Sequence, residues 1–222
     1  MKKAVIIIIF SFVFTCMLFS EHIFSINVGF NVGDEKIIKD DNLYNVNDST
    51  IVAGAEYNYL FPFNLYTGGF IQIGYNNFNT WLLNDDININ ANGIKFLFAP
   101  VIGYKIGHKN FFSIGVIPVY FEYALLNGTN KYYERTYNGN YYSYYSQKTE
   151  TISFKNGIFG SGLRLNFQWG KNSTTYGFSV AGYLPWYFGM YDLDLKQYED
   201  TKITSSANGF KFELCYRMSF CK

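Results

Sequence analysis

Large apolar residues alternate with small or charged residues along the last stretch of the chain, residues 210–220. The apolar residues occupy every even position, namely Phe210, Phe212, Leu214, Tyr216, Met218 and Phe220. The odd positions hold Lys211, Glu213, Cys215, Arg217 and Ser219. A period of two residues indicates a β-strand with two unlike faces. Because about eleven residues suffice for a tilted strand to cross the hydrocarbon core of a bilayer, this stretch predicts a membrane-crossing strand.

The same alternation recurs in seven earlier segments. These are residues 24–33, 51–59, 65–75, 93–104, 112–118, 159–169 and 176–184. The alternation slips at Pro118, which predicts a β-bulge there. The polar connections are long at 34–49, 78–92, 126–149 and 190–207, and short at 60–64, 107–110 and 170–173. About eight strands joined by alternating long and short connections predict an all-β fold, an antiparallel up-and-down transmembrane β-barrel.

Composition favours a barrel that faces lipid over a soluble barrel. Aromatic residues make up 21% of the chain and charged residues 16%, against a usual charged share of about 25%. The polar face is mostly Gly, Ser and Asn, which suits a narrow interior filled by side chains. Aromatic residues at the predicted strand ends indicate interfacial girdles, with Trp169 and Tyr104 on the short-turn side and Trp186 and Tyr75 on the long-loop side. The net charge of +1 gives no electrostatic case for nucleic acid.

The N-terminus reads as an export signal. Lys2 and Lys3 precede an apolar run from Ala4 to Phe19, which is typical of a secretory signal peptide. We therefore expect a signal peptide at 1–20 and a barrel domain at 21–222, with Ser20 or Ser25 as the last residue removed. Cys16 leaves a lipoprotein as an alternative, and an uncleaved anchor helix is another.

With these strands in view, the chain resembles the small eight-stranded outer-membrane barrels of the OmpA-domain, OmpX and opacity-protein type. The resemblance covers the whole mature chain and rests on its architecture and its final aromatic strand. It implies a monomer in the bacterial outer membrane, in contact with its lipids, whose last strand is read by the barrel assembly machinery. Tyr216, Met218 and Phe220 would carry that signal, although Cys221 and Lys222 follow Phe220 and depart from the family pattern.

Charged residues on the inward face predict ion pairs inside the barrel. Glu56, Arg164 and Arg217 fall near the short-turn end of three different strands. Because buried charges need partners, we expect these three side chains to share a network. Glu213 and Lys95 should lie nearer the long loops, in a second cluster.

The third long connection contains the strongest hairpin signal of the chain, Asn138-Gly139, typical of a type I′ turn. We therefore expect the fifth and sixth strands to continue past the membrane into a protruding hairpin. Its tyrosines, Tyr132, Tyr133, Tyr137, Tyr141, Tyr142, Tyr144 and Tyr145, alternate with small polar residues, as in binding loops. Alternatively, the tyrosines lie at the membrane interface or pack on neighbouring loops.

Candidate chemistry points away from catalysis. Outer-membrane lipid A acyltransferases and deacylases are similar in architecture and use a catalytic His on the outer side, whereas this chain has only His22 beside the signal and His108 in a predicted inner turn. No catalytic, cofactor or metal site is expected. The sequence predicts a barrel without an open pore that acts through its loops, in adhesion, recognition of a host or matrix ligand, or membrane structure. A lipid-modifying enzyme and a narrow channel remain the alternatives.

Overall fold

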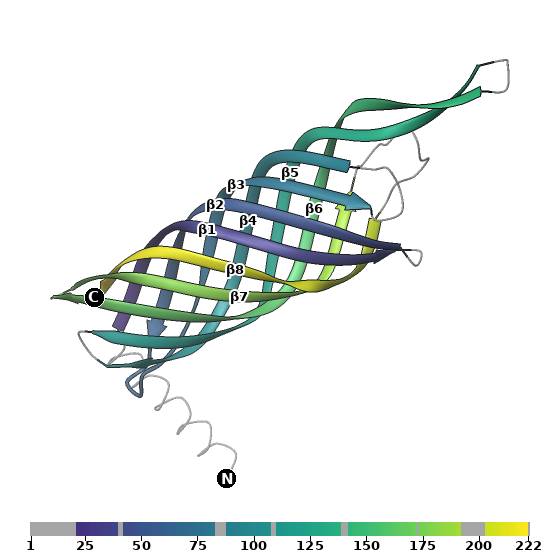
Figure 1. The fold of residues 1–222 in the computed structure, drawn as a ribbon. Helices are drawn as coiled ribbons and strands as arrows, with labels where there is room; N and C mark the ends of the chain where they lie inside the picture. Colours follow the sequence, from purple (N-terminus) through teal and green to yellow (C-terminus); the bar gives the residue numbers. More distant parts are fainter. Residues whose placement is uncertain are drawn as a thin grey trace, which may run out of the picture.

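The computed structural model describes residues 21–39, 42–82, 88–107, 110–138, 142–171, 173–191 and 203–221, which form one closed antiparallel barrel (Figure 1). Its strands are β1 (Glu21–Lys39), β2 (Asn42–Leu60), β3 (Leu65–Leu82), β4 (Asn88–Ile106), β5 (Phe111–Asn138), β6 (Tyr142–Lys171), β7 (Thr174–Tyr191) and β8 (Ile203–Cys221). Each strand pairs with its neighbours in sequence, and β1 pairs with β8 to close the ring. The predicted all-β, up-and-down fold is confirmed. The expected signal peptide lies outside the described residues.

No helix within these described ranges is long and apolar enough to span a membrane.

The short connections gather at one end of the barrel, here called the turn end. Between β2 and β3, the Phe61 amide donates to the Leu65 carbonyl (2.8 Å) and the Asn64 amide donates to the Phe61 carbonyl (3.0 Å). Asn64 has a φ of 66° and Gly107, after β4, has a φ of 93°. Asn and Gly are the residues that tolerate this left-handed backbone, so the sequence can reverse direction here within a few residues.

The opposite end, here called the loop end, contains more strand than the polar stretches predict. Residues 34–49 are expected to be a connection, but β1 runs to Lys39 and β2 begins at Asn42. The strands continue because their backbones stay paired, from Asp34 opposite Asn47 to Lys39 opposite Asn42. Apolar alternation does not reveal this part because its described outward positions, Asp34, Asn47 and Ser49, are polar.

Cross-strand rows on the outward face show where the membrane surface lies. One apolar row follows the register across β2–β5 and comprises Ile51, Tyr75, Ile94 and Leu125. The next row toward the loop end, here called the amide row, continues to β6 and comprises Ser49, Asn77, Asn92, Asn127 and Ser153. The row after that, the second amide row, comprises Asn47, Asn79, Asn90, Thr129 and Thr151. On β2–β5 the outward face therefore changes from apolar to uncharged polar within one pair of residues, as expected at the bilayer boundary.

The inward face is mixed at the same level. Seven buried apolar residues beyond the boundary, here called the apolar cap, are Val46, Phe78, Ile89, Ala91, Leu126, Ile152 and Phe154. The rings of Phe78 and Phe154 meet edge to face at 5.4 Å. Asp48, Asn130 and Glu150 are buried at this level too. Below the boundary the interior holds both buried charges and apolar side chains such as Phe70, and large apolar side chains such as Ile71 (59% exposed) face outward. The barrel is thus a water-facing structure at its loop end and a lipid-facing structure below.

The bulge predicted at Pro118 is confirmed. The register between β5 and β6 shifts between Ile117 and Tyr120. The shift turns the following even-numbered residues inward, so Tyr120 and Glu122 become fully buried in the lumen. The bulge therefore decides which residues of β5 can join the interior network.

Candidate functional site

The lumen contains a buried group of ion pairs, here called the arginine cluster, made of Glu56, Arg164, Arg217 and Glu213. Glu56 Oε2 lies 2.8 Å from Arg164 Nη1 and 2.7 Å from Arg217 Nη1. Arg164 Nη2 lies 3.9 Å from Glu213 Oε1, and the Tyr183 hydroxyl donates to Glu213 Oε2 at 3.0 Å. With two cations and two anions the cluster is neutral, which limits the cost of burying it.

Hydroxyl and amide groups complete the arginine cluster. Arg217 donates to the Ser25 hydroxyl (2.8 Å), the Asn166 carbonyl oxygen (3.1 Å) and the Ser219 hydroxyl (3.1 Å). Arg164 Nε donates to Ser179 (2.7 Å). These contacts give a role to four small polar residues of the inward face, Ser25, Asn166, Ser179 and Ser219, because a buried guanidinium has five donors to satisfy.

A second neutral group, here called the lysine cluster, lies nearer the loop end. Its members are Asp48, Lys95, Glu122 and Lys211. Lys95 Nζ lies 2.5 Å from Asp48 Oδ2 and 3.2 Å from Glu122 Oε1. Lys211 Nζ contacts the same two oxygens at 3.2 Å and 2.7 Å. Each cation therefore bridges both anions, and four strands are tied together at one level.

The two clusters divide the residues differently from the sequence interpretation. The structure brings Glu56, Arg164 and Arg217 together, but Glu213 joins them instead of sharing a second cluster with Lys95. The reason is the length of Arg164, whose guanidinium reaches both Glu56 and Glu213. Sequence reasoning grouped Lys95 with Glu213 and did not identify its actual partners, Asp48 and Glu122. Asp48 and Glu122 could not be assigned to the inward face from the sequence, because Asp48 falls within a predicted connection and Glu122 follows the slip at Pro118. Lys211 could have been assigned, because the alternation of the last strand places it on the inward face.

Further buried side chains pack inside the described lumen. Tyr120 and Tyr183 are fully buried and pack edge to face at 5.1 Å. The Phe70 ring lies 4.4 Å from the Arg164 guanidinium carbon, in cation–π geometry. At the turn end the interior combines hydroxyl and amide groups with buried apolar side chains such as Ile23 and Leu60, and the arginine cluster, the lysine cluster and the apolar cap follow toward the loop end. Interiors crowded by side chains are typical of barrels of eight strands.

The hairpin of β5 and β6 projects beyond the other strands at the loop end (Figure 1). These strands contain 28 and 30 residues, whereas the other strands contain 18 or 19. Pairing of β5 with β4 stops at Lys131 opposite Asn88, and pairing of β6 with β7 stops at Lys155 opposite Tyr191. Beyond these points the described strands form a two-stranded ribbon that ends with Asn138 opposite Tyr142.

The predicted type I′ turn at Asn138-Gly139 is wrong in register. Such a turn would pair Tyr137 with Asn140, whereas Tyr137 lies opposite Ser143. The β5–β6 pairing register is set in the apolar cap, where Leu126 lies opposite Phe154 and both side chains must face inward to be buried. A two-residue turn would shift the pairing by an odd number and place inward residues opposite outward ones.

Only part of the predicted binding residues lies within the described side chains. Tyr132 is half-buried at the base of the free ribbon. Gly139 and Tyr141 lie outside the described residues, and the side chains of Tyr133, Tyr137, Asn138, Tyr142, Tyr144 and Tyr145 lie outside the described side chains.

The predicted girdle and assembly residues lie on the outward face. Trp169 and Tyr104 are exposed near the turn end, and Trp186 and Tyr75 are exposed toward the loop end. On β8, Tyr216 and Phe220 are exposed and Met218 is half-buried. Phe220 lies between Phe24 of β1 and Thr174 of β7, at the seam that closes the ring.

Neither metal-binding nor histidine chemistry has an obvious place in the described part of the chain. No group of three or more His, Cys, Asp or Glu side chains there could hold a metal ion. His22 lies at the turn end, where its Nδ1 is 2.6 Å from the Tyr57 hydroxyl. His108 lies outside the described residues. Cys215 and Cys221 are free thiols.

No protein-family model matches the chain, and no curated protein matches it either. Among solved structures, the outer membrane protein OprG from Pseudomonas aeruginosa is similar over 89% of this chain and 95% of its own, with 13% identity and a TM-score of 0.51. Ail, the attachment invasion locus protein of Yersinia pestis, matches over 88% of this chain and 97% of its own, with 12% identity and a TM-score of 0.34. The likeness to OprG shows that the fold is that of a small outer-membrane β-barrel.

Proposed function

We propose that this outer-membrane barrel is a surface recognition protein that binds a host or matrix ligand through the β5–β6 hairpin. The barrel holds the hairpin above the membrane and is itself closed to transport. The observation that carries this proposal is the free ribbon, in which residues 132–138 and 142–148 pair with each other beyond the rim of the other strands.

The ribbon offers two modes of recognition. Its backbone edges have no strand neighbour among the described residues, and such an edge accepts an extended peptide by strand addition. Its sequence is rich in Tyr, Ser and Asn, the residues that binding loops use for rigid contact area and adaptable hydrogen bonds. The pairing of β5 with β6 limits the conformational entropy that binding would otherwise cost.

The filled lumen supports a role outside the barrel. Ions would have to displace two neutral clusters and then the apolar cap to pass from end to end. The buried charged groups of the two clusters pair with one another and offer no free charge to a passing ion. The closed interior therefore favours binding over diffusion.

The same proposal includes the route to the membrane and the absence of catalysis. The N-terminal segment directs export, the assembly machinery reads Tyr216, Met218 and Phe220, and the closed ring functions as a monomer. The position of His22 at the turn end, away from the outer leaflet, supports a non-enzymatic role. A lipid A and phospholipid product assay on the purified barrel tests this part, and turnover would overturn it.

The main test removes the ribbon while keeping the barrel. Asn130 lies opposite Glu150 and donates to its carboxylate at 2.9 Å, so these residues can close a shorter hairpin. Residues 131–149 are replaced by Asn-Gly, which suits a two-residue connection between opposite positions. Cells that carry this variant should lose adhesion to matrix-coated surfaces and host-cell monolayers while surface levels stay normal.

A second variant separates tyrosine chemistry from ribbon length. Replacing Tyr133, Tyr137, Tyr142, Tyr144 and Tyr145 by Thr keeps β-propensity and length but removes the rings. If ring contacts dominate, this variant should adhere as poorly as the deletion. If strand addition dominates, it should adhere nearly as well as the parent. Unchanged adhesion of the deletion variant would exclude the hairpin as the binding element.

A further inference from the structure

We propose that the outward face of β2–β5 binds a glycolipid of the outer leaflet, with an acyl chain in an apolar groove and an uncharged sugar headgroup on the two amide rows. This site is separate from the hairpin and does not depend on its function. Two features on the same strands carry the inference.

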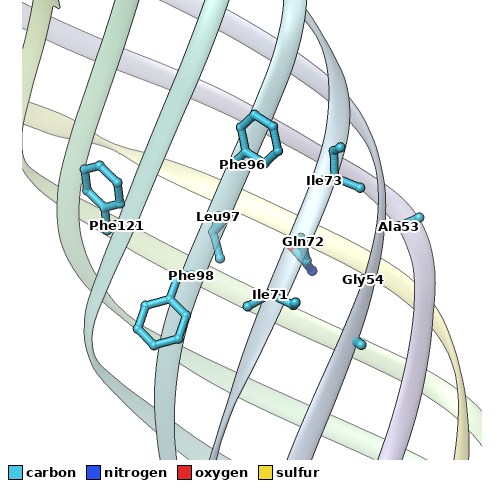
Figure 2. Close-up of a pocket in the computed structure, with 10 residues that line it drawn as sticks. Ala53, Gly54, Ile71, Gln72, Ile73, Phe96, Leu97, Phe98 and Phe121 are labelled. Carbon is cyan, nitrogen blue, oxygen red and sulfur yellow. The ribbon is translucent and has the colours of Figure 1, made fainter.

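The first feature is the groove itself (Figure 2). It has a volume of about 720 Å³ and lies on the lipid-facing surface, where Ala53 and Ala55 of β2 lie beside Ile71 and Ile73 of β3. Phe96 and Phe98 of β4 form its opposite wall. The small alanine side chains leave space that the large phenylalanines do not fill, so a hydrocarbon chain can lie along the strands.

An apolar groove in a membrane does not by itself select a ligand. Lipid tails surround the whole barrel, and moving a chain from bulk lipid into the groove changes little apolar surface exposure to water. Selection must therefore come from the polar end of the lipid. This requires a recognition surface at headgroup depth directly above the groove.

The second feature supplies that surface. Above the groove come the apolar row and then the two amide rows, which continue without interruption across β2–β5. All of their members are Asn, Ser or Thr, and none carries a charge. Within the amide row, Ser153 on β6 donates to the Asn127 carboxamide oxygen, which holds that side chain across the strands.

The chemistry of the rows fits a sugar better than a phosphate. A carboxamide offers both donors and acceptors, as do the hydroxyls of a sugar, so the two can pair in either direction. A phosphate would call for Lys or Arg; the rows themselves contain neither on β2–β5, and the nearest lysines, Lys131 and Lys155, lie outside the rows. The row spacing, about 4.8 Å across strands and about 6.7 Å along them, places several carboxamides within reach of one hexose ring.

The amide rows lie at headgroup depth, so their ligand must be a component of the same membrane. Asn77 and Asn92 point sideways from the barrel wall, directly above Tyr75 and Ile94 of the apolar row. A molecule that contacts them must lie beside the barrel in the headgroup layer. A glycolipid meets this condition while its acyl chain occupies the groove below.

The experiment measures lipids retained by the full mature barrel. Nanodiscs of phosphatidylcholine receive equal amounts of monogalactosyl diacylglycerol and of diacylglycerol with the same chains, and native mass spectrometry counts the lipids bound to the released protein. We expect the galactolipid to be enriched about tenfold over diacylglycerol, the effect of a few net hydrogen bonds. Equal retention of the two lipids would overturn the proposal.

Variants assign the binding to the two features. Asn77→Ala with Asn92→Ala and Asn127→Ala should abolish the enrichment, and Ala53→Phe should lower retention of both lipids by filling the groove. Asn110→Ala, exposed at the turn end, is the matched control and should change nothing. Enrichment that survives the triple variant would contradict the proposal. Each variant is checked for the heat-dependent gel shift of a folded barrel, and Asn92→Ala alone replaces the triple variant if that one fails to fold.

Two further measurements test whether the sugar must be part of a lipid and whether a charged headgroup is also bound. Methyl galactoside in solution should not displace the galactolipid, because the acyl chain contributes to binding. Complete displacement would mean a soluble-sugar site and would overturn the assignment to a membrane lipid. Phosphatidylglycerol in place of the galactolipid should show no enrichment, and equal enrichment would contradict recognition by uncharged groups.

Discussion

Arg164 of β6 reaches across the lumen to Glu56 of β2, with Nη1 2.8 Å from Oε2. In a ring of eight strands, β2 and β6 lie on opposite walls. Both side chains are almost fully buried, so this ion pair braces the barrel across its diameter in a region without bulk water. The strength of such a pair depends on the presence of both partners.

Glu56→Gln should therefore be strongly destabilising. The change leaves Arg164 and Arg217 near one another, and the remaining carboxylate of the cluster, Glu213, lies 3.9 Å from Arg164. Removing one partner of a buried pair costs about 3–5 kcal/mol, so the urea midpoint of unfolding in lipid should fall markedly. An unchanged midpoint would contradict a structural role for the arginine cluster.

Glu21→Gln provides the matched comparison for that measurement. Glu21 lies 3.7 Å from Lys105 at the turn end, and its side chain is 57% exposed. Exposed ion pairs contribute at most about 1 kcal/mol. The Glu21 variant should unfold close to the parent, and a loss as large as that of the Glu56 variant would show that burial is not what matters.

Arg164→Ala should leave a cavity at the level of the arginine cluster. Arg164 is the largest of the fully buried side chains, and its removal leaves space between Glu56, Glu213 and Phe70. We expect neither the parent protein nor the variant to give steady current steps in planar bilayers, because the lysine cluster and the apolar cap still close the lumen of the variant. Steady steps from the parent would show that the filled interior conducts and would favour a channel.

Arg substitutions along one face of β4 should locate the membrane boundary. Phe96 and Asn92 both point outward, four residues apart, on either side of the change in polarity. Phe96→Arg places a charge in the hydrocarbon region at about 2–4 kcal/mol, whereas Asn92→Arg near the surface should cost about 0–1 kcal/mol. Equal unfolding midpoints of the two variants in lipid vesicles would mean that the boundary is misplaced.

Hydrogen exchange should separate the free ribbon from the barrel wall. Amides of residues 132–138 belong to a two-stranded segment, whereas residues 124–130 of the same strand pair on both sides. Local opening is easier in the ribbon, so its amides should exchange about tenfold faster or more. Mass spectrometry of peptides from β5 measures the contrast. Equal protection would indicate that another segment covers the ribbon.

The sequence by itself determined the class of structure. A side-chain period of two, repeated in eight segments, decides which residues face lipid and which face inward, because a strand has only two faces. The slip at Pro118 and the inward positions of Glu56, Arg164 and Arg217 follow from the same local rule. The projection of the hairpin was also predicted from the sequence, because the Asn138-Gly139 turn signal lies many residues beyond the last alternating apolar positions of the fifth and sixth strands.

Only the tertiary structure decided which residues meet. Strand tilt and register bring Asp48, Lys95, Glu122 and Lys211 from four strands to one level, and no local pattern encodes that level. The reach of Arg164 assigned Glu213 to the arginine cluster, and the pairing of Leu126 with Phe154 overrode the Asn138-Gly139 turn signal. The alignment of the amide rows above the groove likewise depends on the register of five strands. Alternation specifies the face of each residue, whereas contacts across a closed barrel depend on how far each strand is staggered against the next.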